Sequence, residues 1–232
     1  MRSKHPVFAC TLGLLLSIAT FTAEPQTPPP SMEKPPVASV PQLMTLEGEF
    51  VRIAYNNEGY VTLGYRTANY SVNQPWMLLE VGVTLREKVK TQVLKRDAFS
   101  VKTPDGKLVP MATEKEYSAE DLRGVQMMAN YSRDSIGYWP TGNLQGCRLG
   151  FFSDIDSPAP AYDQVELNSQ RGCLGRLYFH IPGGVKTGQH WLIVKFATST
   201  IEVPFRVLTK EEEKYLRKNW EGIKKDYDAS PK

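Results

Sequence analysis

The chain has 232 residues, of which 41% are hydrophobic and 23% are charged, close to the values of ordinary globular proteins. This composition excludes a chain that is disordered throughout, a collagen-like repeat and a membrane protein with many spans. The formal charge of +3 falls to about +1 without residues 1–23, which hold two of the 28 Lys and Arg residues and none of the 25 Asp and Glu residues. A nearly neutral chain carries no electrostatic footprint for nucleic acid, so no nucleic-acid partner is expected.

The first 23 residues predict a secretory signal peptide. Arg2, Lys4 and His5 form a short basic segment, and the 17 residues 7–23 follow without a charge. As a helix they would span roughly 26 Å, less than the ~30 Å hydrocarbon core of a bilayer. We therefore expect an extracytoplasmic protein that is secreted, periplasmic or associated with the cell envelope. Contact with the membrane is expected only if the segment stays uncleaved as a signal anchor.

Residues 24–45 predict a semi-rigid tether. Seven of the 17 prolines fall within residues 24–41. Proline fixes φ and lacks a donor N–H, so such a stretch favours an extended polyproline II conformation. A spacer and a proline-rich ligand for a partner are the two alternatives.

Residues 46–208 show the period-two alternation of antiparallel strands. In residues 77–86 every second side chain is apolar, from Met77 to Leu85, while Glu80, Thr84 and Arg86 share the other face. The Pro104-Asp105-Gly106 turn predicts a hairpin over residues 96–111. Pro204 is expected on an edge strand or on the non-bonded side of one, because proline cannot donate to a sheet ladder. Further strands are expected around residues 51–55, 61–65, 149–151, 165–167, 177–181, 191–196 and 201–207. Eight or nine short strands between turn residues predict an all-β antiparallel sandwich.

Residues 209–228 predict a single amphipathic helix. Thr209 and Glu212 have the spacing of a capping box. One apolar stripe follows at helical spacing, formed by Leu216, Trp220, Ile223 and Tyr227. The helix either packs on the sandwich or presents this stripe to a partner.

Five segments carry a resemblance to a known family: MLLEVGVTLRE, DAFSVKTPDGKLVP, GRLYFHIPGG, HWLIVKF and IEVPFRV. They resemble exported bacterial immunoglobulin-like domains of unknown function, found in lipoproteins and secreted proteins. The resemblance covers residues 48–112 and 174–208. It implies an immunoglobulin-like β-sandwich over 46–208 and an extracytoplasmic location, and it carries over no catalytic residues. Residues 113–173 depart from the pattern and form a long excursion.

Cys147 and Cys173 are the only cysteines outside the predicted signal peptide. An even number of cysteines in an exported protein favours a disulfide. The alternative, a metal site, lacks further ligands, because no Cys-x-x-Cys occurs and His180 stands alone. The sequence therefore predicts a Cys147–Cys173 disulfide and no metal.

The excursion contains the residues that we expect to contact a partner. Tyr131, Arg133, Tyr138 and Trp139 mix aromatic rings with arginine, a composition typical of protein contact surfaces. Flat rings also stack on the apolar faces of sugars. Three alternatives remain: a loop that folds back over one end of the sandwich, a protein contact and a glycan contact.

Two classes of function compete. No HExxH, GxSxG or P-loop motif occurs, and no cofactor is expected. The leading hypothesis is a non-enzymatic binding or structural module of the cell envelope, with an envelope protein or a glycan as its partner. The alternative is a glycan-binding or glycan-hydrolysing protein that uses the carboxylates of Asp154, Asp156 and Asp163. These carboxylates could also bind calcium or simply lie in a solvated loop.

Overall fold

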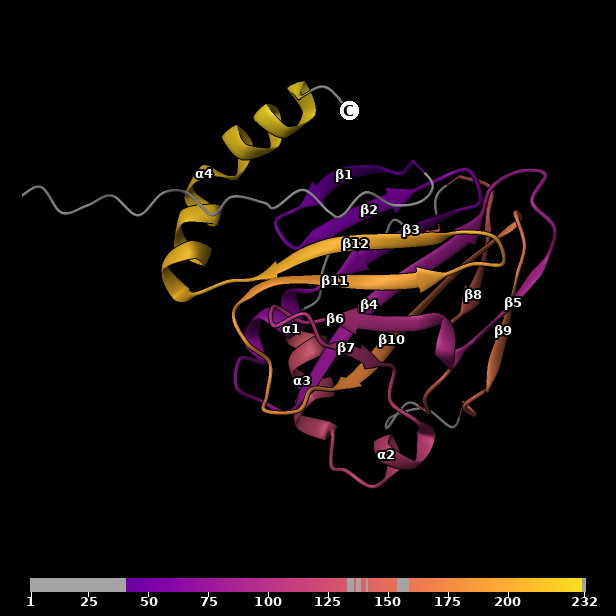
Figure 1. Ribbon diagram of the computed structural model, residues 1–232, viewed down its shortest axis with the longest axis horizontal. Coiled ribbons are helices and arrows are strands. Elements are labelled where there is room, and N and C mark those ends of the chain that lie inside the picture. The colour runs from indigo at the N-terminus through magenta and orange to yellow at the C-terminus, as the bar shows by residue number, and fades with distance from the viewer. Residues whose placement is uncertain (1–40, 133–135, 137–138, 141, 154–158, 231–232) are drawn as a thin grey trace, which may run out of the picture.

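The computed structural model of the chain describes residues 41–230 apart from 133–135, 137–138, 141 and 154–158 (Figure 1). The predicted signal peptide and most of the predicted tether lie outside the described residues. The tether was predicted to extend to residue 45, but the first strand already begins at Leu43. This end of the prediction was too long by three residues, because Leu43 and Met44 belong to an edge strand rather than to the spacer.

The larger of two main sheets has six strands in the order β1-β2-β3-β4-β10-β8. Their bounds are β1 Leu43–Gly48, β2 Val51–Tyr55, β3 Gly59–Gly64, β4 Trp76–Leu85, β10 Arg171–His180 and β8 Gln145–Arg148. Each neighbouring pair is antiparallel except β8 and β10, which run parallel.

The smaller main sheet has four antiparallel strands in the order β12-β11-β6-β7. Their bounds are β12 Thr200–Val207, β11 Gly188–Lys195, β6 Phe99–Lys102 and β7 Leu108–Pro110. A separate antiparallel pair joins β5 (Gln92–Lys95) to β9 (Gln164–Leu167). Pro204 lies on β12, an edge strand, so the expected place of this proline is confirmed.

Four α-helices accompany the strands in the described part of the chain: α1 Arg66–Tyr70, α2 Glu114–Ser118, α3 Arg123–Tyr131 and α4 Lys210–Ala229. A short 3-10 turn, Arg96–Ala98, precedes β6. The predicted capping box forms at α4, where Thr209 and Glu212 exchange hydrogen bonds. None of these helices is both long and apolar enough to cross a membrane.

One hydrophobic core receives side chains from both main sheets. Figure 1 shows β11 and β12 crossing in front of the larger sheet. Apolar side chains from alternating positions of the strands fill this core and are each at most 2% exposed, among them Val81, Val83, Leu85, Phe99, Val101, Phe179, Val203 and Phe205. The chain is therefore mostly β, with antiparallel sheets around a shared core and a C-terminal helix, as the sequence predicts.

Two local expectations were wrong. The strand predicted at 77–86 is buried on both faces as β4, not half-buried, because helix α3 and Trp139 cover its outer side. Leu149 to Phe151 form no strand, and β8 ends at Arg148 instead. The excursion over residues 113–173 contributes α2, α3, β8 and β9, and of these β9 agrees with the strand expected at 165–167.

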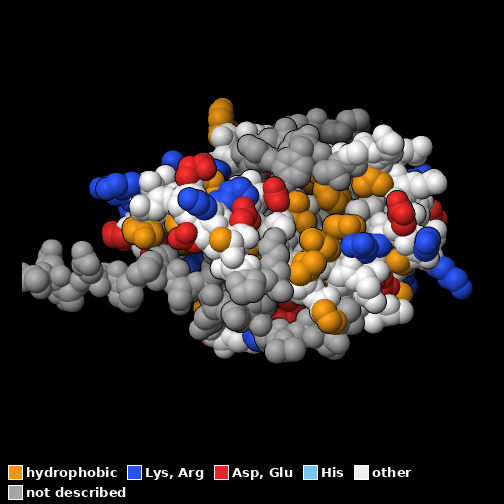
Figure 2. Space-filling view, turned by 90° about the horizontal axis from the view of Figure 1, so that it is seen from above, with side chains coloured by type: hydrophobic (Ala, Val, Ile, Leu, Met, Phe, Trp, Pro, Cys, Tyr) orange, Lys and Arg blue, Asp and Glu red, His pale blue; other side chains and the backbone are white. Residues whose placement is uncertain are grey.

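Helix α4 lies on the edge of the larger sheet and has no fully buried residue. The Tyr227 hydroxyl donates to the Met44 carbonyl of β1 at 3.1 Å, and Leu216 packs against the core. Figure 2 shows charged side chains of both signs gathered over α4 and a group of hydrophobic side chains beside them. The helix therefore packs on the sheets, while its apolar stripe stays partly exposed.

Candidate functional site

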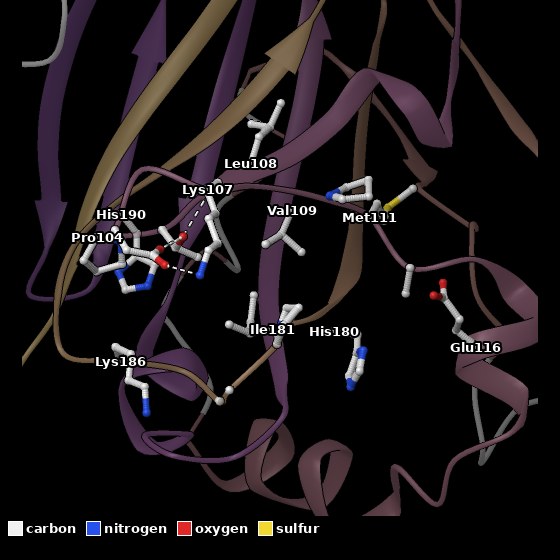
Figure 3. A pocket seen from close by; sticks show the side chains of 17 residues that line it. Pro104, Lys107, Leu108, Val109, Met111, Glu116, His180, Ile181, Lys186 and His190 are labelled. Atoms are coloured by element: carbon white, nitrogen blue, oxygen red, sulfur yellow. Dashed lines mark hydrogen bonds and ion pairs between the residues drawn. The ribbon is translucent and has the colours of Figure 1, made fainter.

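A groove of about 770 Å³ lies between the β6–β7 hairpin and the loop that joins β10 to β11 (Figure 3). Residues 103–112 form one wall and residues 180–186 form the other. Its volume is within the range of about 300–1,000 Å³ that is typical of ligand pockets. Segments about 70 residues apart in the chain thus come together at one side of the molecule.

The hairpin wall owes its shape to the predicted turn. The Gly106 amide donates to the Thr103 carbonyl at 2.9 Å, and Gly106 has a positive φ of 82°. Such a φ favours glycine, because it has no Cβ. The Lys107 ammonium lies 2.7 Å from the Asp105 carboxylate, and the Thr103 hydroxyl donates to the same group at 2.5 Å. These hydrogen bonds lower the pKa of Asp105 to about 2, so this carboxylate is engaged within the turn.

The opposite wall depends on two glycines that follow Pro182. Gly183 and Gly184 both have a φ of 80°. A Cβ on Gly184 would lie 2.9 Å from the Asn73 carbonyl oxygen, closer than packing allows. The Val185 carbonyl accepts from the Asn73 amide at 2.8 Å and fixes the loop against the segment before β4. The sequence thus places this wall by backbone contacts, which leaves its side chains available to the groove.

The floor of the groove is apolar. Val109, Met111 and Ile181 line it, are 8%, 4% and 3% exposed, and belong to the hydrophobic core. At the rim, Leu108 is 57% exposed. A leucine this exposed beside a hollow with apolar walls is typical of a contact surface.

His190 is the most perturbed titratable group at the groove. Its side chain is fully buried and stacks on Phe205 with ring centroids 5.3 Å apart. Burial lowers its pKa to about 4, although the hydrogen bond to the Gly188 carbonyl acts in the opposite direction. Nδ1 lies 3.0 Å from that carbonyl, which assigns the ring proton to Nδ1, and the buried Nε2 has no partner among the described residues. His190 is therefore a neutral, structural histidine at neutral pH.

Glu116 and His180 lie toward the other end of the groove. The Thr113 amide and hydroxyl each donate to the Glu116 carboxylate at 2.8 Å as part of the α2 capping box, and they lower its pKa below the ordinary value. His180 is exposed and packs against Trp76 at 5.2 Å. The carboxylates of Asp105 and Glu116 are thus hydrogen-bonded to groups of the protein itself. The groove therefore offers a ligand its shape, its apolar floor and the charges at its rim.

Of the four predicted contact residues, the structure describes Tyr131 and Trp139, and these two differ in exposure. Tyr131 ends α3 and is 86% exposed, next to Met127, which is 56% exposed. Trp139 is only 7% exposed and packs over Gly82, where a Cβ would lie 2.9 Å from its indole. Arg133 and Tyr138 lie outside the described residues. Tyr131 is therefore exposed enough to contact a partner, whereas Trp139 packs against the outer face of β4.

The predicted carboxylate cluster is represented by one residue. Asp163 is fully exposed, and its carboxylate lies 4.0 Å from Arg96 Nε. Asp154 and Asp156 lie outside the described residues. Within the described ranges, no three His, Cys, Asp or Glu side chains are close enough to hold a metal ion.

The predicted disulfide is confirmed. Cys147 of β8 and Cys173 of β10 are bonded, with Cα atoms 4.3 Å apart, and they are register partners in the parallel pair. Cys173 is fully buried. The bond therefore joins β8 of the excursion to the start of β10. The other end of β10 leads into the wall of the groove.

Sequence reasoning did not find the groove itself. It identified the Pro104-Asp105-Gly106 turn but made no prediction for the turn at Gly183 and Gly184, and no local signal shows that two distant turns face each other. No protein-family model, curated protein or solved structure matches the chain. The resemblance to exported immunoglobulin-like domains stays a prediction.

Proposed function

We propose that this chain is a non-enzymatic, extracytoplasmic binding or structural module of the cell envelope, and that its partner docks in the groove beside β7. The observation that carries this proposal is the combination of an open groove, an apolar floor and an exposed Leu108 at its rim. A disulfide in a β-rich chain supports an oxidising compartment.

An immunoglobulin-like sandwich is the architecture that we propose for this module. Two mainly antiparallel sheets that share one core support it. The parallel β8–β10 pair and the separate β5–β9 pair are additions supplied by the excursion. In such sandwiches the sheets stay fixed while loops and edges supply recognition, which agrees with a groove built from two turns.

Binding explains the groove better than catalysis does, because among the four carboxyl and imidazole side chains that line it, three are engaged within the protein and only His180 is left to meet a ligand. A general acid or base needs a carboxylate or imidazole that can reach a substrate and exchange a proton. Here Asp105 and Glu116 are ionised and held by hydrogen bonds from their own turn and helix. His190 is buried with a pKa near 4. These groups therefore maintain the walls of the groove.

Position-specific photo-crosslinking tests the proposal. A photoreactive amino acid replaces Leu108 in the groove, Tyr131 on α3, or Tyr162, which is 53% exposed and serves as the control. Each purified protein is irradiated with an envelope extract of the native host. We expect a discrete adduct from Leu108 and little from Tyr162. A discrete adduct only from Tyr131 would move the site to α3, and equal labelling at all three positions would contradict a specific site.

A further inference from the structure

The chain uses its own side chains to occupy two sheet edges. At β12, the Gln42 amide group pairs with the backbone of Glu202: Nε2 donates to the carbonyl at 2.7 Å and Oε1 accepts from the amide at 3.1 Å. At β1, the Lys224 ammonium of α4 donates to the Leu46 carbonyl at 2.8 Å. Open edges attract further strands, so these contacts protect the two edges.

Strand β7, the other edge of the smaller sheet, is arranged differently. The Thr103 amide donates to the Lys107 carbonyl at 2.9 Å, and the Met111 amide donates to the Phe99 carbonyl at 3.1 Å. Bonded pairs in an antiparallel ladder recur at every second residue. Val109, midway between these two pairs, therefore directs its backbone groups toward β6.

The same alternation directs the backbone of Leu108 and Pro110 away from β6, to the outer side of β7. The next outward residue, Ala112, already donates its amide to the Tyr178 carbonyl of β10 at 2.9 Å, so the open stretch of this edge ends at Pro110. Leu108 offers both an N–H and a C=O there, whereas Pro110 offers only a C=O. The groove runs along this side and is lined by the whole of β7. These groups are one donor, the Leu108 N–H, and two acceptors, the Leu108 and Pro110 carbonyls, spaced as in a β-strand. The ligand that matches them is the backbone of another extended segment.

We propose that β7 receives an extended segment of a partner protein as an added antiparallel strand. This proposal rests on the proposed function and specifies the kind of partner. The added strand forms three hydrogen bonds: two with Leu108 and one with the Pro110 carbonyl. Alternate side chains of the segment point into the groove, where Val109 and Ile181 provide an apolar floor.

Charge at the two ends of the groove sets the direction and composition of the segment. Figure 3 shows Lys186 at one end and Glu116 at the other, with Val109 and Ile181 between them. Because β7 runs toward Glu116, an antiparallel segment has its N-terminal end near Glu116 and its C-terminal end near Lys186. A basic residue at its N-terminal end and an acidic one at its C-terminal end are therefore complementary. Such exposed pairs add little affinity, but they favour one orientation.

Binding of synthetic peptides to the purified full chain tests strand addition. The probes are short blocked peptides with Lys first, alternating Thr and an apolar residue in the middle, and Glu last. Val, Leu or Phe serves in turn as the apolar residue. Each is compared with two versions that are N-methylated at alternate residues, in one register or the other. Both versions stiffen the backbone equally, but only one removes the N–H groups that face β7. We expect that version to bind at least about tenfold more weakly, since two hydrogen bonds of about 1 kcal/mol each are lost.

Two variants of the chain supply the matching test. Leu108→Pro removes the outward N–H, and Leu108→Ala keeps it while removing the side chain. We expect Leu108→Pro to weaken peptide binding more than Leu108→Ala does, with unchanged circular dichroism for both. Equal binding by the two N-methylated peptides, or no binding by any peptide at about 1 mM, would overturn strand addition.

The remaining outcomes separate this proposal from the proposed function. A concentration-dependent dimer that Leu108→Pro makes monomeric would show that β7 pairs with a second copy, and would reject the partner segment. A glycan adduct at Leu108, or a protein adduct without an effect of N-methylation, would keep the groove as the binding site and reject strand addition. No adduct at Leu108, together with register-dependent peptide binding, would support the strand site and count against an envelope partner.

Discussion

Acidification should destabilise the fold through His190. In the folded chain its pKa is about 4, whereas the unfolded value is 6.5. The unfolded state therefore binds more protons between these two values, so the free energy of unfolding falls as the pH drops from 6.5 to about 4 and levels off below. The difference of about 2.5 pKa units at 1.36 kcal/mol per unit corresponds to a loss of about 3 kcal/mol. Such a loss is a large fraction of the stability of an ordinary domain.

Urea unfolding at a series of pH values, for the wild type and for His190→Asn, measures this contribution. Asparagine keeps a side-chain donor near the Gly188 carbonyl and does not titrate in this range. The variant loses packing on Phe205, so its stability should be lower at pH 7. The informative quantity is the difference between the two pH profiles, because other groups contribute equally to both. Parallel profiles between pH 7 and pH 4 would refute the assignment of a buried, neutral His190.

The remaining predictions concern three contacts that hold separate parts of the fold. Glu58→Gln should destabilise the chain by about 2–3 kcal/mol in urea unfolding, because the buried carboxylate accepts from Gln92, Thr198 and Ser199 and an amide cannot accept all of these hydrogen bonds. Burial raises the pKa of Glu58, but these hydrogen bonds together outweigh it, so the pKa lies below its ordinary value and this stabilisation should be lost as the pH falls. Glu58→Asp, a carboxylate that is one methylene shorter, is the control. Reducing the disulfide should cost roughly 3–4 kcal/mol for a sequence separation of 26 residues, and an unchanged thermal midpoint under dithiothreitol would contradict this. Thr209→Ala should cost about 1 kcal/mol and increase amide exchange in the first turn of α4, whereas Thr209→Ser should preserve both.

Sequence patterns predicted those elements whose signals are local. The hairpin at 96–111 carries Pro-Asp-Gly, and α4 carries its capping box, so turn and helix were both placed correctly. Along the excursion, apolar and polar residues alternate less regularly in the sequence. Helix α2 does carry a local signal, the Thr113–Glu116 capping box, which was overlooked in the sequence. With only 5 and 9 residues, α2 and α3 depend on packing more than on their own sequence.

Alternation identified β2 as a strand but did not show which face is inside. The alternation predicts Val51, Ile53 and Tyr55 as the apolar face. Val51 is buried, but Ile53 and Tyr55 are only half-buried, whereas Arg52 and Ala54 on the other face are buried. Arg52 is tolerated there because its guanidinium donates to the carbonyls of Gly48 and Val51, each at 2.9 Å. A hydropathy pattern does not show that a charged side chain is buried when backbone carbonyls satisfy its hydrogen bonds. The same limit applies to Trp139, whose place over β4 depends on a glycine far away in the sequence.

The two edges of the smaller sheet show how an edge can stay open without pairing indefinitely. Glu202 of β12 directs its backbone outward, and Pro204, two residues further on, follows the same alternation without an N–H. Pro110 occupies the equivalent position on β7. A proline at an outward position removes one donor and shortens the stretch that another strand can pair with. On β12 the side chain of Gln42 pairs with the outward backbone of Glu202, whereas on β7 Leu108 keeps both of its groups beside a hollow. Full pairing along β7 would join copies of the chain into larger sheets. An edge limited to one complete residue and one carbonyl is instead suited to a short segment, whose affinity then depends on the side chains that fit the groove.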